Sequence, residues 1–190
     1  MKKYLFILTA FISLTAFTTF DNSWNNDPAH SQLGFTVTHL GVSDVSGFFN
    51  DFQVTINASK ADFSDAVFEM TAKTASIDTR VEARNNHLKS ADFFDVEKYP
   101  EMTFKSSSFK KSGSNKYKIT GNLTLHGITK PVTLDAVYRG SVENPMSKKQ
   151  TAGFQISGTI KRSDFQVGDK FPAQMVSDEV KIKADGEFAQ

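Results

Sequence analysis

Four histidines are the residues of this 190-residue sequence best suited to binding a metal or moving a proton near neutral pH. They are His30, His39, His87 and His126. Zinc sites commonly take two ligands from one short segment, but the sequence has no H-x-H, H-x-x-x-H or H-E-x-x-H motif. It also has no cysteine and no G-x-S-x-G motif that would supply a nucleophile. We therefore expect no metal, no other cofactor and no catalytic residue.

Two of the histidines are better explained by structural roles. His126 is in phase with the polar face of its predicted strand and precedes Gly127, which indicates a turn. His30 follows Pro28 and is expected to cover one end of the fold. His39 and His87 remain as candidates for binding.

A helix is predicted within residues 76–104, the one stretch that interrupts the strand patterns. Thr79 followed by Glu82 matches a capping box, in which each side chain bonds a free backbone N–H at a helix start. Val81 and Leu88, seven residues apart, are expected to dock on one face of this helix.

The same helix is predicted to carry a cationic face. Arg80, Arg84 and His87 lie three or four residues apart, so their side chains share one side. The adjacent Phe93 and Phe94 follow in a connection, where paired aromatic residues usually plug a core.

The elements that must position these residues are strands, because apolar residues recur at every second position from residue 31 onward. We count eight strands, over 33–37, 48–57, 66–72, 102–104, 116–126, 132–138, 152–160 and 180–188. Closure of an antiparallel sheet removes both exposed edges. The expected fold is therefore all-β, a closed eight-stranded antiparallel barrel with a short helical insertion between the third and fourth strands. Such a barrel is roughly 28 Å long, enough to hold a long lipid tail.

Two polar residues are in phase with the apolar face and should point into the barrel. They are His39 and Arg162, each at a strand end. An inward arginine needs a partner, and Asp178 could pair with it as a structural ion pair. Alternatively, the two residues form a polar mouth for an amphiphile with an anionic or amide head group.

A set of short motifs covers the chain after residue 26 in order. They are D-x-x-H-S (27–31), V-x-G-x-F (45–49), R-x-x-H-L-x-S-x-D-F-F-D (84–95), Y-P-x-M-x-F (99–104), GNLTLHGITKPVTL (121–134) and R-S-D-F (162–165). Together they resemble the YceI-like family of secreted, lipocalin-like polyisoprenoid-binding proteins. The chain departs from the family at Asn85, where an aspartate often follows the arginine matching Arg84.

The resemblance implies a non-enzymatic protein that binds a long-chain amphiphilic lipid, polyisoprenoid or fatty-acid-like, for carriage, storage or sensing. The inward faces then predict the residues that contact the tail: Phe35, Phe52, Val54, Phe68, Met70, Leu123, Phe154 and Ile156. The residues expected to meet the head group are His39, Arg162, Arg84 and His87.

The first residues are predicted to be an export signal. Lys2 and Lys3 precede an apolar run over 4–17, which is the layout of a signal peptide. We assign 1–20 to the signal peptide and 21–190 to the lipid-binding barrel, and expect a periplasmic or secreted protein. Without the leader, 20 basic and 21 acidic residues remain of the 22 and 21 in the chain, which argues against nucleic acid as a partner. Homodimerisation is left open.

Three alternatives follow from the same residues. An enzyme could use His39 and His87 on a bound lipid or with a metal. An outer-membrane barrel is allowed by eight strands. It is disfavoured by the few Trp and Tyr residues and by Lys118, Lys161 and Lys181 on the polar face. A fully packed barrel would serve only as an interaction module, and residues 163–177 would then be a plain connection rather than a lid.

Overall fold

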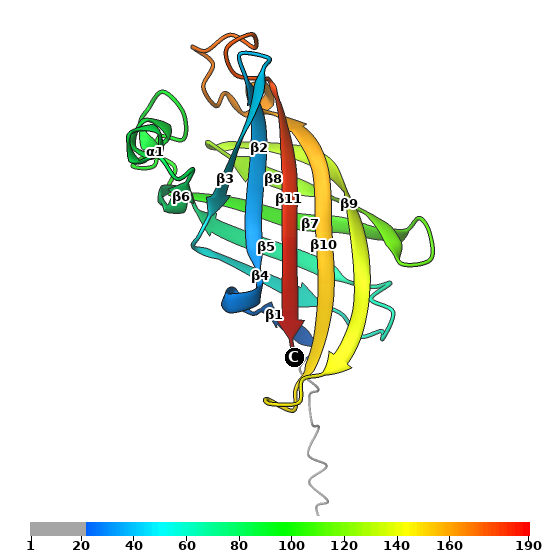
Figure 1. The fold of residues 1–190 in the computed structure, drawn as a ribbon. Coiled ribbons are helices and arrows are strands. Elements are labelled where there is room, and N and C mark those ends of the chain that lie inside the picture. The colour runs from blue at the N-terminus through cyan, green and yellow to red at the C-terminus, as the bar shows by residue number, and fades with distance from the viewer. Residues whose placement is uncertain (1–21) are drawn as a thin grey trace, which may run out of the picture.

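The fold was obtained as a computed structural model that describes residues 22–190 (Figure 1). The predicted signal peptide lies outside the described residues. The strands are β1 Ser23–Asn26, β2 Gln32–His39, β3 Ser43–Phe49, β4 Phe52–Asn57, β5 Val67–Lys73, β6 Ile77–Asp78, β7 Glu101–Lys111, β8 Lys116–Leu125, β9 Ile128–Glu143, β10 Gln150–Lys161 and β11 Glu179–Ala189. The helices are α1 Glu82–Lys89 and the 3₁₀ helices η1 Pro28–His30, η2 Thr74–Ser76 and η3 Arg162–Phe165.

Eight of these strands form a closed antiparallel ring. Their order is β1, β4, β5, β7, β8, β9, β10 and β11, and β11 pairs again with β1. The hairpin of β2 and β3 continues the wall, because β2 pairs with β11 and β3 pairs with β6. The predicted closed eight-stranded barrel with one short helical insertion is confirmed.

The wall differs from the prediction near its N-terminus. The strand β1 was not predicted, since four residues are too few to show an alternation. The predicted strand 48–57 is divided into β3 and β4 at Asn50 and Asp51. There the N–H of Asn50 donates to the carbonyl of Ser76 at 3.2 Å, and the carbonyl of Asp51 accepts from Lys73 at 2.9 Å. These bonds take the two residues out of the strand ladder.

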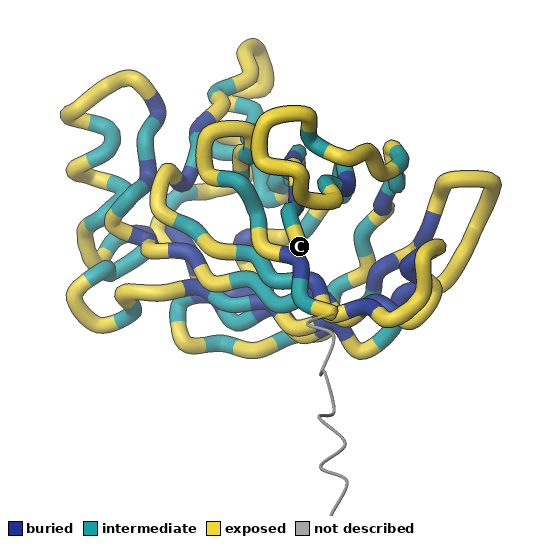
Figure 2. Tube along the Cα trace, turned by 90° about the horizontal axis from the view of Figure 1, so that it is seen from below, coloured by how far each residue is buried: buried dark blue, intermediate teal, exposed yellow. Residues whose placement is uncertain are grey.

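The alternation of polar and apolar residues does decide which side chains point inward. Along β8, Tyr117 and Ile119 are buried whereas Lys118 between them is exposed. Figure 2 shows the same exchange of buried and exposed positions along the strands. Each inward side chain removes apolar surface from water, which stabilises the closed sheet.

One end of the barrel interior is filled by a cluster of aromatic side chains, here called the floor. Its centre is Phe154, which is 1% exposed and contacts the rings of Phe63 and Tyr138 at centroid distances of 5.1 and 5.2 Å. The floor consists of Trp24, Phe63, Phe68, Phe109, Tyr117, Tyr138, Phe154 and Phe188. Residues of β1 and of the end of β11 contribute to the floor. The floor therefore lies at the end of the barrel that holds the C-terminus (Figure 1).

The opposite end of the barrel gathers the long connections. In Figure 1, α1, the turn between β2 and β3, and the connection from β10 to β11 lie together at the upper end. The predicted capping box is wrong: α1 begins after Val81, which has no side-chain cap and is 46% exposed. Within residues 22–190, no helix is long and apolar enough to cross a membrane.

Candidate functional site

A cavity of about 450 Å³ occupies the half of the barrel away from the floor. Inward side chains such as Leu33, Val37 and Ile160 are only partly buried because they face this space. The interior is therefore not filled, which argues against the fully packed barrel. The volume falls in the range of pockets that bind small molecules.

Seven of the eight residues predicted to contact a lipid tail line the cavity. They are Phe35, Phe52, Val54, Phe68, Met70, Leu123 and Ile156. Phe154 is wrongly placed by the prediction, because it is in phase with the inward face but lies within the floor. Lipid contact by the other seven stays a prediction.

Polar side chains line the cavity only toward its opening, here called the mouth. They are His39, Thr79, Arg84, His87 and Arg162, and all four predicted head-group residues are among them. The cavity is bordered there by three exposed residues from different segments, His39 of β2, His87 of α1 and Met175 of the connection 166–177. We call this connection the mouth segment.

Arg162 folds the mouth segment around its guanidinium group. It is 7% exposed, and each of its five N–H groups donates to a backbone carbonyl. The acceptors are Ser177 (3.2 Å from Nε), Val167 and Gly168 (3.1 and 2.7 Å from Nη1), and Phe171 and Val176 (2.6 and 3.0 Å from Nη2). Arg162 thus has no donor left for a head group, although its charge stays beside the cavity.

The predicted ion pair between Arg162 and Asp178 is wrong. One carboxylate oxygen of Asp178 instead accepts from the backbone N–H of Ser163 at 3.0 Å. Backbone carbonyls satisfy the buried guanidinium here, because the mouth segment turns back over it. Every residue has a backbone carbonyl, so the sequence does not predict which ones accept from Arg162.

Arg84 is also anchored, but it keeps free donors. Its Nε donates to the hydroxyl of Thr79 at 2.8 Å, and its Nη2 donates to the Thr79 carbonyl at 2.7 Å. Arg84 lines the cavity, and within residues 22–190 nothing accepts a hydrogen bond from its Nη1. Arg84 is therefore the charged residue at the mouth that still has N–H groups to offer.

Asn85 fixes Thr79 in the position that Arg84 needs. Its side-chain oxygen accepts from both the N–H and the hydroxyl of Thr79, at 2.8 and 2.6 Å. Its amide nitrogen donates to Asp78 at 3.0 Å, which an aspartate at this position could not do. Hydrogen bonds from Arg80 and Asn85 hold the pKa of Asp78 below its usual range. The Asn85 side chain thus links Thr79 and Asp78 in one hydrogen-bond network beside α1.

His87 joins α1 to the mouth segment. Its ring meets the edge of Phe93 and Phe171, at 5.1 and 5.5 Å, and those two rings stack at 4.8 Å. Asp92 accepts from Lys170 at 2.6 Å and lies 3.2 Å from His87. The bonds from Lys170 and then His87 lower the pKa of Asp92. The sequence did not indicate this cross-link, since its halves are far apart in the chain.

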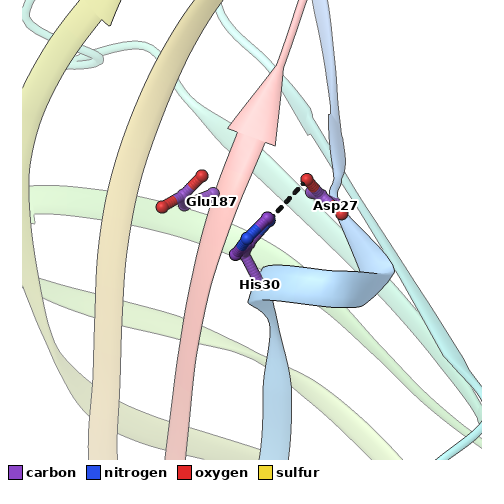
Figure 3. Close-up of side chains that lie close together, drawn as sticks. All are labelled: Asp27, His30 and Glu187. Carbon is purple, nitrogen blue, oxygen red and sulfur yellow. Dashed lines mark hydrogen bonds and ion pairs between the residues drawn. The ribbon is translucent and has the colours of Figure 1, made fainter. Parts of the chain in front are cut away.

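A second group of titratable residues lies at the floor end, outside the barrel (Figure 3). Asp27 caps η1 through Ala29 N–H and pairs with His30 Nδ1, both at 2.8 Å. Figure 3 shows the His30 ring turned toward Asp27, and the side chain of Glu187 on β11. Asp27 raises the pKa of His30, chiefly through this hydrogen bond. None of the three lines the cavity, and the expectation that His30 covers one end of the fold stays a prediction.

The fold and the cavity together define a class of protein. A closed antiparallel barrel that encloses an apolar cavity with polar groups at one opening is the architecture of lipocalin-like binding proteins. The model of the family described as "YceI-like domain" matches residues 24–188, and the chain belongs to this family. A UPF0312 protein of Pectobacterium atrosepticum is 40% identical over 170 residues, which cover 88% of each chain. One of Staphylococcus aureus is 37% identical and covers 86% of this chain and 95% of its own.

Solved structures agree with this assignment. BcnA of Burkholderia cenocepacia superposes with a TM-score of 0.77 at 29% identity, over 85% of this chain and 98% of its own. The YceI protein of Campylobacter jejuni gives 0.73 at 34% identity, over 80% and 89%. A polyisoprenoid binding domain from Saccharophagus degradans gives 0.64 at 14% identity, over 88% and 98%, and is similar in fold alone.

Proposed function

We propose that this protein binds one long-chain amphiphilic lipid, polyisoprenoid or fatty-acid-like, with the tail in the barrel cavity and the head group at the mouth. It carries, stores or senses this lipid in the periplasm or outside the cell, and it performs no chemical step. The apolar cavity of about 450 Å³, closed at the floor and open at the mouth, is the observation that carries the proposal.

The placement of polar groups supports an amphiphile rather than a plain hydrocarbon. A polar head left unpaired in an apolar site loses its hydrogen bonds with water, so a binding site must replace them. Arg84 Nη1, His39 and His87 offer such partners where the cavity meets solvent. Arg162 supports them from behind by holding the mouth segment in place.

The comparisons support the isoprenoid class. The protein from Saccharophagus degradans that has the same fold is a polyisoprenoid binding domain. The lysine pair and apolar run at the start of the sequence support export. Branched isoprenoid chains and straight acyl chains present similar apolar surface to a phenylalanine-lined cavity, so both stay within the proposal.

A chain-length series tests the proposal. Isoprenyl alcohols of increasing length are added from ethanol to the purified protein, and the bound fraction is measured by native mass spectrometry. Each buried methylene is worth about 0.8 kcal/mol, so affinity should rise with length until the cavity is full and then level off. An affinity independent of chain length would contradict tail binding.

Arg84→Met with Arg80→Met as its control separates the head-group site from general charge. Arg84 lines the cavity, whereas the exposed Arg80 does not. Loss of Arg84 should weaken the binding of fatty acids more than that of isoprenyl alcohols, because only the carboxylate forms an ion pair with the guanidinium group. Equal effects on both ligand types would remove Arg84 from the head-group site.

A further inference from the structure

Exposed apolar side chains gather beside the mouth. Leu40 and Val42 are 55% and 83% exposed and lie on the turn between β2 and β3. The N–H of Leu40 donates to the carbonyl of Met175 at 3.0 Å, which places the half-exposed Met175 next to this turn. We call residues 40–42 the rim turn.

The rim turn has an unfavourable sequence for its conformation. The N–H of Val42 donates to the carbonyl of His39 at 3.1 Å, and Leu40 and Gly41 both have positive φ, 52° and 69°. Asn or Gly is preferred at the first of these positions, and an L-residue with a bulky side chain is strained there. Neither Leu40 nor Val42 belongs to the core. Leu40 is strained and exposed and does not stabilise the fold, which indicates that it contacts another molecule.

The rim turn is continuous with the cavity. Val37 and Val45, on the two strands that lead into the turn, both line the cavity, and so does His39. The lining of the cavity therefore continues along this hairpin from the apolar Val37 and Val45 to His39, at the base of the rim turn. A tail that leaves the cavity along this side passes His39 before it meets the apolar side chains of Leu40 and Val42.

The charges around the mouth favour no charged partner. The three segments that border it, 39–44, 79–92 and 161–181, carry seven Lys or Arg and seven Asp or Glu residues. An acidic or basic protein surface gains little from such a balance. The interfacial region of a lipid bilayer accepts exposed apolar side chains without needing a net charge.

We propose that the rim turn inserts Leu40 and Val42 into the surface of a phospholipid bilayer and holds the mouth against the membrane while a lipid enters or leaves. This inference rests on the proposed function, because it assigns the membrane as the source or destination of the bound lipid. The rim turn acts in transfer, and the cavity alone acts in binding.

Flotation with uncharged phosphatidylcholine vesicles tests the docking. The variant Leu40→Asn with Val42→Thr removes two apolar side chains and suits the turn better. The control, Val142→Thr with Met146→Gln, removes two apolar side chains that are 67% and 92% exposed at the floor end. We expect the rim variant to lose roughly tenfold or more in vesicle affinity, and the control to float like the unaltered protein.

Two further readouts separate docking from lipid binding. The rim variant should bind isoprenyl alcohol added from ethanol as the unaltered protein does, yet transfer it between vesicles more slowly. A tryptophan at the turn, Val42→Trp, should shift its emission to the blue on vesicles, whereas Met146→Trp should not. The single native Trp24 is buried in the floor and gives a constant background.

The outcomes against the inference are distinct from those against the proposed function. Equal flotation of the rim variant and its control overturns membrane docking and points to a protein partner at the turn. Flotation only with anionic vesicles overturns apolar insertion. If the rim variant no longer binds isoprenyl alcohol added from ethanol, the docking inference is also overturned, because the turn would then be needed for binding in the cavity. Flotation of a protein that binds no lipid supports docking but contradicts the proposed function.

Discussion

The floor and the mouth half of the barrel are built by the same strands, yet one is packed and the other is hollow. Along β10, Ala152 and Phe154 are at most 1% exposed, whereas Ile156 and Ile160, farther along the same face, border the cavity. The alternation of the strand selects the inward residues in both halves. Side-chain volume and the connections decide whether the space between them is filled.

The connections act differently at the two ends. At the floor, the loop between β4 and β5 inserts Phe63 into the interior, where it meets Trp24 and Phe154 at 5.1 Å each. At the mouth, Phe93 and Phe171 stack on each other and cover the edge of the cavity without filling it. The floor is thus held by packing, and the mouth by hydrogen bonds around Arg162 and Asp92.

Removing the same side-chain atoms from each half should give the largest difference. Ile56→Ala empties a position in β4 that is 0% exposed beside the floor, and should cost about 2–5 kcal/mol of unfolding free energy. Ile156→Ala enlarges an existing cavity and should cost about 1 kcal/mol, because fewer contacts are lost. Urea unfolding of both variants measures the difference. Equal losses would mean that the mouth half is as tightly packed as the floor.

Arg162→Lys tests whether hydrogen-bond geometry, rather than charge, holds the mouth. A lysine has three donors on one atom and cannot reach five carbonyls, so we expect a local loss of about 3 kcal/mol. Amide hydrogen exchange should rise in the mouth segment and stay unchanged in the floor strands. Arg84→Lys is the control, since Arg84 bonds only Thr79. Amide hydrogen exchange that stays slow in the mouth segment of Arg162→Lys would contradict the claim that the five hydrogen bonds of Arg162 hold this segment.

Adding side-chain volume should have opposite consequences in the two halves. Ala152→Leu overpacks a residue that is 0% exposed at the floor, and should cost about 1–3 kcal/mol of unfolding free energy. Ala184→Leu fills part of the cavity, so it should leave stability nearly unchanged and weaken lipid binding roughly tenfold. Urea unfolding of both variants measures the change in stability, and ligand titration measures the change in lipid affinity. Weaker binding in Ala152→Leu alone would place the ligand elsewhere.

The smallest effect is expected from the surface pair at the floor end. The pKa of His30 is raised above 6.5, so its stabilising charge is present at low pH and is lost as pH rises through the raised value. The pKa of Asp27 is lowered below 3.8, so its contribution is lost only as pH falls through that lowered value. The pair therefore stabilises the protein between about pH 4 and pH 6.5.

Asp27→Asn isolates this charge, because the amide oxygen can still cap η1 through Ala29. The pKa of His30, followed by NMR, should fall toward 6.5, and the melting temperature should drop slightly at pH 5 but not at pH 9. Asp92→Asn at the mouth serves as the control and should leave His30 unchanged. An unaltered His30 titration in Asp27→Asn would contradict the pair.

The closed barrel could be predicted because its signal is local. Alternation over β8 or β10 is visible within a few residues, and it placed seven tail residues on the cavity wall. The interruption of the strand pattern over 76–104 also predicted the helical insertion. What remained hidden depends on contacts between distant segments. Phe154 belongs to the floor only because a loop inserts Phe63 against it. Arg162 donates to backbone carbonyls, and no residue type in the sequence predicts which carbonyls these are.

The insertion shows a competition that the sequence could not resolve. Thr79 and Glu82 fit a capping box, but the Thr79 hydroxyl bonds Asn85 and Arg84 instead. These bonds satisfy a buried side chain, whereas an exposed helix end can be satisfied by water. Tertiary contacts therefore won over the local pattern, at the place where the mouth is built.

The most direct test of the hollow mouth half is native mass spectrometry of the protein purified from a bacterial periplasm without detergent, followed by denaturation and solvent extraction. We expect a discrete added mass that is released as one long-chain lipid and is reduced in Ala184→Leu but not in Ala152→Leu. A bare polypeptide mass that takes up neither isoprenyl nor fatty-acyl lipids would contradict lipid binding in the cavity.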